Sequence, residues 1–148
     1  MIINKTLFSL TLLCLCFYGQ AQQSINVKLK INLNSSDNFQ HQLSNCSAII
    51  YENSLIIDSL FIKGHVFKYE LSNRALYKVI FKKPDFVSKH IIVNTTNYPE
   101  KRFKKFKLKA DLGLFHVRGN ANINFLDKEP ISIAYYNEIK KEIMCIKN

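Results

Sequence analysis

The chain has 148 residues, of which 47% are hydrophobic and 22% are charged. This composition suits one globular domain with one core, and it excludes an intrinsically disordered chain. The formal net charge is +10, and with four Gly and three Pro the chain is neither collagen-like nor of low complexity.

The first 21 residues have the pattern of a secretory signal peptide. Lys5 precedes a mostly apolar run at 7–18, and Gly19 and Ala21 place small residues at positions −3 and −1 of a cleavage site. The run is too short to span a bilayer well, so we expect cleavage after Ala21 and no transmembrane span in the remaining chain. A buried N-terminal helix or a membrane anchor is the alternative. The predicted protein is exported to the periplasm, to the outer membrane or out of the cell.

From residue 22 onwards the sequence predicts a series of short strands. Apolar and polar residues alternate at 25–33, 66–71, 77–82 and 106–114, and apolar runs occupy 46–52, 55–62 and 90–94. Seven strands separated by turn residues at this spacing predict an all-β, seven-stranded antiparallel β-sandwich over residues 22–125. Residues 126–148 are predicted as a short C-terminal extension of uncertain structure, because the pattern after Pro130 fits both a helix and a strand.

Several of these segments resemble a known domain. They read AIIYE at 48–52, GHVFKYEL at 64–71 and YKVIFKKPDFVSK at 77–89, and the similarity extends over residues 25–136. They resemble the carboxypeptidase regulatory-like domain of secreted and envelope proteins of Bacteroidota, which has a transthyretin-like β-sandwich fold. The resemblance implies a non-catalytic module without a cofactor.

The chain departs from the family pattern at two turn positions. Lys63 replaces an Asp before the hairpin glycine, and Asp85 replaces the glycine that follows the proline. Gly64 fits a turn with a positive φ, and position 85 requires a turn that Asp tolerates. The resemblance also implies that Tyr77 and Phe86 are core aromatic residues.

No motif of an enzyme or of a metal site is present in the sequence. The four histidines lack the ligand spacings of zinc sites, and the phosphate-binding loops and the nucleophile elbow are absent. We therefore expect no enzymatic activity, no metal and no cofactor. A small hydrolase whose site is not recognisable in the sequence is an alternative.

Basic residues are concentrated in one segment. Of the nine residues at 101–109, six are basic, namely Lys101, Arg102, Lys104, Lys105, Lys107 and Lys109. From residue 105 they alternate with apolar residues, which predicts a row of lysines along one side of a strand. Such a patch suits an acidic partner, namely an acidic glycan, an anionic lipid surface or an envelope protein, and we expect no nucleic acid. A solvated face or an edge strand guarded by lysines would have the same pattern.

Two cysteines, Cys46 and Cys145, remain after removal of residues 1–21. In an oxidising compartment they are a candidate disulfide. The alternative is that each serves separately as a small apolar residue.

Together these features predict an exported, non-enzymatic β-sandwich module that binds a partner or gives structural support in the bacterial envelope or outside the cell. An accessory subunit of an outer-membrane transport, secretion or peptidoglycan-attachment complex is the alternative prediction.

Overall fold

The protein, described here by a computed structural model, is all-β over residues 26–37, 41–72, 74–99, 106–117 and 128–147. The strands of these residues are β1 (Val27–Ser35), β2 (Cys46–Glu52), β3 (Leu55–Ile62), β4 (Val66–Leu71), β5 (Leu76–Lys82), β6 (Lys89–Asn94), β7 (Phe106–Leu114), β8 (Ser132–Asn137) and β9 (Glu142–Lys147). The described part of the chain contains no helix with the length and apolar character needed to cross a bilayer. The predicted signal peptide at 1–21 lies outside the described residues.

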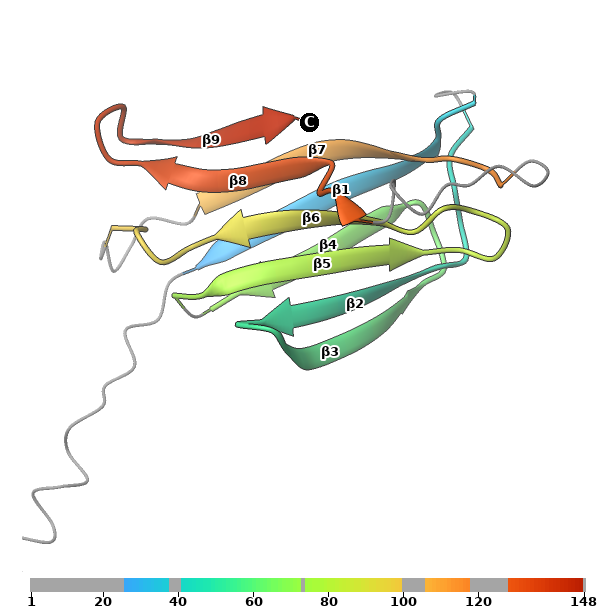
Figure 1. Cartoon of the computed structure of the whole chain (residues 1–148), viewed down its shortest axis with the longest axis horizontal. Helices are drawn as coiled ribbons and strands as arrows, with labels where there is room; N and C mark the ends of the chain where they lie inside the picture. Colours follow the sequence, from blue (N-terminus) through green and yellow to red (C-terminus); the bar gives the residue numbers. More distant parts are fainter. Residues whose placement is uncertain (1–25, 38–40, 73, 100–105, 118–127, 148) are drawn as a thin grey trace, which may run out of the picture.

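The strands form two sheets that are layered as a sandwich. The smaller sheet has the order β4-β1-β7, and the larger sheet has the order β3-β2-β5-β6-β8-β9. Figure 1 shows the larger sheet in front, from β9 at the top to β3 at the bottom, with β7, β1 and β4 behind it. Each sheet therefore has an inner face toward the core and an outer face.

Two strand pairs are parallel, so the predicted purely antiparallel, seven-stranded sandwich is wrong in this respect. β1 pairs with β7 in parallel and β6 pairs with β8 in parallel, whereas the other pairs are antiparallel. Parallel partners need a long crossover connection. Each crossover here contains strands of the other sheet. Between β1 and β7 the chain forms β2, β3, β5 and β6 of the larger sheet, and between β6 and β8 it forms β7 of the smaller sheet. Residue alternation predicts which face a side chain occupies, but it does not identify the neighbouring strand.

The C-terminal residues belong to the sandwich and are not a separate extension. β8 and β9 form a hairpin, and β8 adds this hairpin to the edge of β6. Ala134 and Tyr136 of β8 are buried in the core. Strands of the same sheet therefore lie on both sides of the predicted boundary at residue 125.

The core fills the space between the two sheets. On β1 every second residue is buried, namely Val27, Leu29, Ile31 and Leu33. On β5 the inward residues include Tyr77, as expected, whereas Phe86 in the following loop is only partly buried. The rings of Phe67 in β4 and Phe81 in β5 meet edge to face with their centroids 5.2 Å apart. This contact joins the two layers directly.

The two turn positions discussed in the sequence analysis, Gly64 and Asp85, differ in the φ angle of their backbone. Asp85 has φ of 64°, so this position is one where Asp takes the left-handed conformation that it tolerates better than most residues. Gly64 does not adopt a left-handed φ, and a Cβ at this position would meet nothing within 4 Å. The expectation that Gly64 is required for a positive φ is therefore wrong.

The predicted disulfide is not formed in this structure. Neither Cys46 nor Cys145 takes part in a disulfide. Cys46 lies in β2 and Cys145 in β9, and β5, β6 and β8 separate these two strands. At the usual interstrand spacing this places them about 19 Å apart, far beyond the roughly 7 Å between Cα atoms that a disulfide allows. Burial raises the pKa of the Cys46 thiol, although the nearby Lys83 charge acts in the opposite direction.

We expect the folded, unreduced protein to leave Cys46 unmodified when it is treated with iodoacetamide. The reason is that its side chain is fully buried and its raised pKa disfavours the reactive thiolate. After denaturation without reductant, both cysteines should be alkylated. Peptide mapping by mass spectrometry measures both outcomes, and a peptide pair linked through Cys46 and Cys145 would contradict this sheet order.

A second prediction concerns the buried hydroxyl of Thr95, which links the residue before β5 to the residue after β6. This hydroxyl accepts a hydrogen bond from the Ala75 N–H and donates one to the Ala75 carbonyl, both at 2.9 Å. Thr95→Val keeps the shape but removes both bonds, so we expect the free energy of unfolding to fall by about 1–3 kcal/mol. Urea denaturation measures the change.

Thr95→Ser is the matched control, because it retains the hydroxyl and should lose less stability. Equal stability of the Val variant and the wild type would show that the two hydrogen bonds do not hold these connections together.

Candidate functional site

The outer face of the smaller sheet carries the part of the predicted basic patch that the structure describes. Lys107 and Lys109 of β7 are exposed, whereas Phe106 and Leu108 beside them are buried. The predicted alternation along this strand is therefore confirmed. The other members of the predicted patch, Lys101, Arg102, Lys104 and Lys105, lie outside the described residues.

The strand register brings further lysines beside these two. Lys28 of β1 lies opposite Lys107, and Lys30 lies opposite Lys109. On the other side of β1, Lys30 lies opposite Lys68 of β4. We call the group of Lys28, Lys30, Lys68, Lys107 and Lys109 the lysine face. Its members come from three strands that are far apart in the sequence.

The dimensions of the lysine face follow from the sheet. Neighbouring strands lie about 4.8 Å apart, and alternate residues of one strand lie about 6.7 Å apart. The five lysines therefore originate from a compact grid. They line an open depression of about 600 Å³ together with Leu29, Tyr69 and Glu70.

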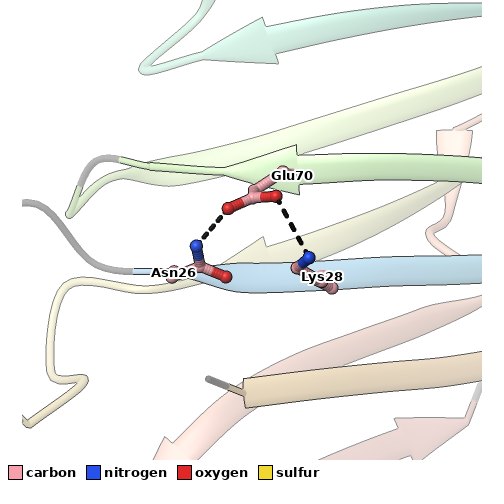
Figure 2. A network of polar contacts seen from close by, with 3 residues as sticks. All are labelled: Asn26, Lys28 and Glu70. Atoms are coloured by element: carbon pink, nitrogen blue, oxygen red, sulfur yellow. Dashed lines mark hydrogen bonds and ion pairs between the residues drawn. The ribbon is translucent and has the colours of Figure 1, made fainter. Parts of the chain in front are cut away.

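Glu70 lies at one corner of the lysine face and is held by two residues of the N-terminal strand region. Its carboxylate lies 3.6 Å from the Lys28 ammonium group and accepts a hydrogen bond from the Asn26 amide, as Figure 2 shows. The two charged side chains are about half exposed. A salt bridge at such an exposed place contributes little stability, from zero to about 1 kcal/mol. Its effect here is to offset the charge of Lys28.

Asp111 occupies the opposite margin of the lysine face. It lies opposite Asn32 in the register, and its carboxylate accepts a hydrogen bond of 2.7 Å from the Asn32 amide. The row between the two margins runs across Lys68, Lys30 and Lys109 and contains no carboxylate. Both acidic residues therefore border the lysines without separating them.

Like charges at directly opposed positions of a sheet destabilise it. Three such pairs occur here, namely Lys28 with Lys107, Lys30 with Lys109 and Lys30 with Lys68. Two unit charges about 6 Å apart in water repel by roughly 0.7 kcal/mol. An anion placed over the grid would relieve this repulsion, so the lysine face is electrostatically arranged to receive negative charge.

Sequence reasoning predicted the orientation of Lys28, Lys30 and Lys68 but not their meeting with Lys107 and Lys109. Lys28 and Lys30 alternate with the buried residues of β1, and Lys68 follows the buried Phe67. This alternation was visible in the sequence. The missing information was that β1 lies between β4 and β7.

Two tyrosine hydroxyls lie near carboxylates, one in the larger sheet at Tyr77 and one beside the lysine face at Tyr69. The Tyr77 hydroxyl donates a hydrogen bond of 3.0 Å to the Glu52 carboxylate. Burial, and then the charge and hydrogen bond of Asp58, raise the pKa of Tyr69, so this phenol stays neutral at physiological pH. Over the described residues, no group of three or more His, Cys, Asp or Glu side chains is placed to hold a metal ion.

Comparisons with known proteins do not assign a function to any of these residues. No family model matches the chain, and no curated protein matches it. The lysine face is therefore the feature on which a functional conclusion can be based.

Proposed function

We propose that this protein is an exported, non-enzymatic binding module that holds an acidic polymer, such as an acidic glycan, on its lysine face. One observation carries the proposal. The register of β4, β1 and β7 gathers five lysines on one face, and the two carboxylates there lie at its margins. An acidic polymer would satisfy several of these cations at once.

The composition of this face favours a soluble polymer over an anionic membrane. Beyond the lysines along the strands, the outward positions hold Asn32, Asn34, Asp111 and Gly113, and Val66 is the apolar one among the outward residues of the three strands. Proteins that bind at a membrane surface combine basic residues with apolar side chains that enter the bilayer. Tyr69 is the aromatic residue that lines the depression, but it lies opposite the buried Leu29 and its ring stacks on the buried Phe67. The outward positions of the three strands therefore lack aromatic side chains on which the bases of single-stranded nucleic acids stack.

The predicted signal peptide and the family resemblance support the remaining parts of the proposal. A segment with the signal pattern at 1–21 supports export to the envelope or the medium. The resemblance to the carboxypeptidase regulatory-like domain, with its transthyretin-like fold, supports a module without catalytic residues. A sandwich of two sheets is compatible with that assignment.

Export is tested by the mass of the protein made in its native host. We expect the intact protein to begin at Gln22, because cleavage after Ala21 removes the apolar segment. Intact-mass spectrometry of envelope and medium fractions measures the N-terminus. A full-length chain confined to the cytoplasm would overturn the export part of the proposal.

Binding is tested by removing charge from the central row of the lysine face. The triple variant Lys30→Gln, Lys68→Gln and Lys109→Gln keeps side-chain length and suits a strand. If each exposed contact contributes about 0.5–1 kcal/mol, affinity for alginate should fall roughly 10- to 100-fold. Isothermal titration calorimetry at low and high salt measures the affinity, and wild-type binding should weaken as salt rises.

The matched control removes three charges elsewhere, at Lys63, Lys128 and Lys140, which are all exposed. This variant should keep most of the affinity, which separates the lysine face from the effect of net charge. Vesicles containing anionic lipid serve as the second probe, and we expect them to bind more weakly than alginate. Equal loss of affinity in both triple variants would refute the lysine face as the binding site.

A further inference from the structure

The outer face of the larger sheet is apolar, in contrast to the lysine face. One row in register crosses Tyr51, Lys78, Ile92, Ile133 and Ile146 on five neighbouring strands. Leu76 lies in the next row and is 46% exposed, and Ile146 is 48% exposed. We call the surface around Tyr51, Leu76, Ile92, Ile133 and Ile146 the apolar face.

The sequence pattern of these strands is typical of strands that are covered on both sides. In β6, Ile91 and Val93 point into the core, and Ile92 between them points outward. In β8, Ala134 points inward and Ile133 points outward. Strands with one solvated face usually alternate apolar and polar residues, as β1 does in this protein.

The apolar face also contains depressions into which side chains of a partner fit. Two neighbouring depressions of about 280 and 300 Å³ lie on it, and Leu76 and Ile92 line both of them. Ile133 and Tyr135 complete one depression, and Tyr51 and Ile80 contribute to the other.

We propose that the apolar face is the contact surface of a homodimer in which the larger sheets of two copies pack face to face. The size of the face is sufficient for this. The row also continues onto β3, where Ile56 lies opposite Tyr51 and is 62% exposed. Six strands of about six residues span roughly 24 Å by 20 Å, or about 500 Å² of flat area per copy. Two such faces reach the roughly 1,000 Å² that a specific interface needs.

The distribution of charge is compatible with a second copy as the partner. The apolar face carries few charges, among them Lys78 and Lys82 on β5 and Glu142 on β9. The lysine face lies on the opposite side of the sandwich (Figure 1). Stacking four sheets about 10 Å apart would place the two lysine faces about 30 Å apart, several times the screening length of roughly 8 Å at physiological salt. Repulsion between the two lysine faces therefore does not oppose this arrangement.

Pairing through the edge strand β3 is less favourable than pairing through the face. The Asp58 carboxylate accepts a hydrogen bond of 2.8 Å from the Ser59 N–H of this strand. The pairing of β2 with β3 also shifts register between Ile50 and Tyr51, and such a bulge discourages an additional strand. The dimer contact is therefore placed on the face and not on this edge.

The test is the molar mass of the purified exported protein in solution. Sedimentation equilibrium should give a dimer at micromolar concentration. The double variant Leu76→Glu and Ile146→Glu should weaken dimerisation by about a hundredfold or more, because it places carboxylates in an apolar contact. Both side chains are about half exposed, so the variant should fold, which circular dichroism and thermal unfolding verify.

Ile139→Glu is the matched control, because Ile139 is 92% exposed in the turn between β8 and β9. This variant should dimerise like the wild type. A wild type that is monomeric at 100 μM, or a folded double variant that dimerises as tightly as the wild type, would overturn the proposal. A monomeric wild type with a different protein bound, lost in the double variant, would show another occupant and would equally overturn it.

Discussion

The two-residue alternation of β1 connects the core of the protein to its charged surface. The strand lies between β4 and β7, and its residues from Val27 to Leu33 are alternately buried and outward. A shift of register by one residue would move Lys28 and Lys30 into the core and expose the apolar side chains. The burial that stabilises the sandwich therefore also determines the position of these lysines.

The two outer faces of the sandwich favour different kinds of partner. The lysine face holds opposed like charges, which favour an anionic partner over an empty surface. The apolar face exposes side chains such as Leu76 and Ile146 to water, which favours a covered state. If both proposals hold, a dimer would present two lysine faces on opposite sides, and one acidic polymer long enough to reach both faces would bind with increased avidity.

Local sequence patterns predicted the strands of this protein well. β2, β3, β4 and β7 begin and end at the predicted residues, and the first, fifth and sixth predicted strands differ from β1, β5 and β6 by no more than two residues at either end. The reason is that period-two alternation and turn residues are local features of the chain. After Pro130 the local pattern fitted two structures, and pairing with β6 selects the strand there. The disulfide prediction failed because sequence does not show the distance between two strands of one sheet.

The sequence by itself determined which side chains point inward and which point outward, because side chains alternate along any extended strand. This was sufficient to predict a lysine row on β7 and the outward position of Lys28 and Lys30 on β1. Only the tertiary structure decided which strands are neighbours, and therefore that the lysines of β1, β4 and β7 form one face. Strand pairing depends on closing long loops and on filling one shared core, and both conditions involve residues far apart in the chain.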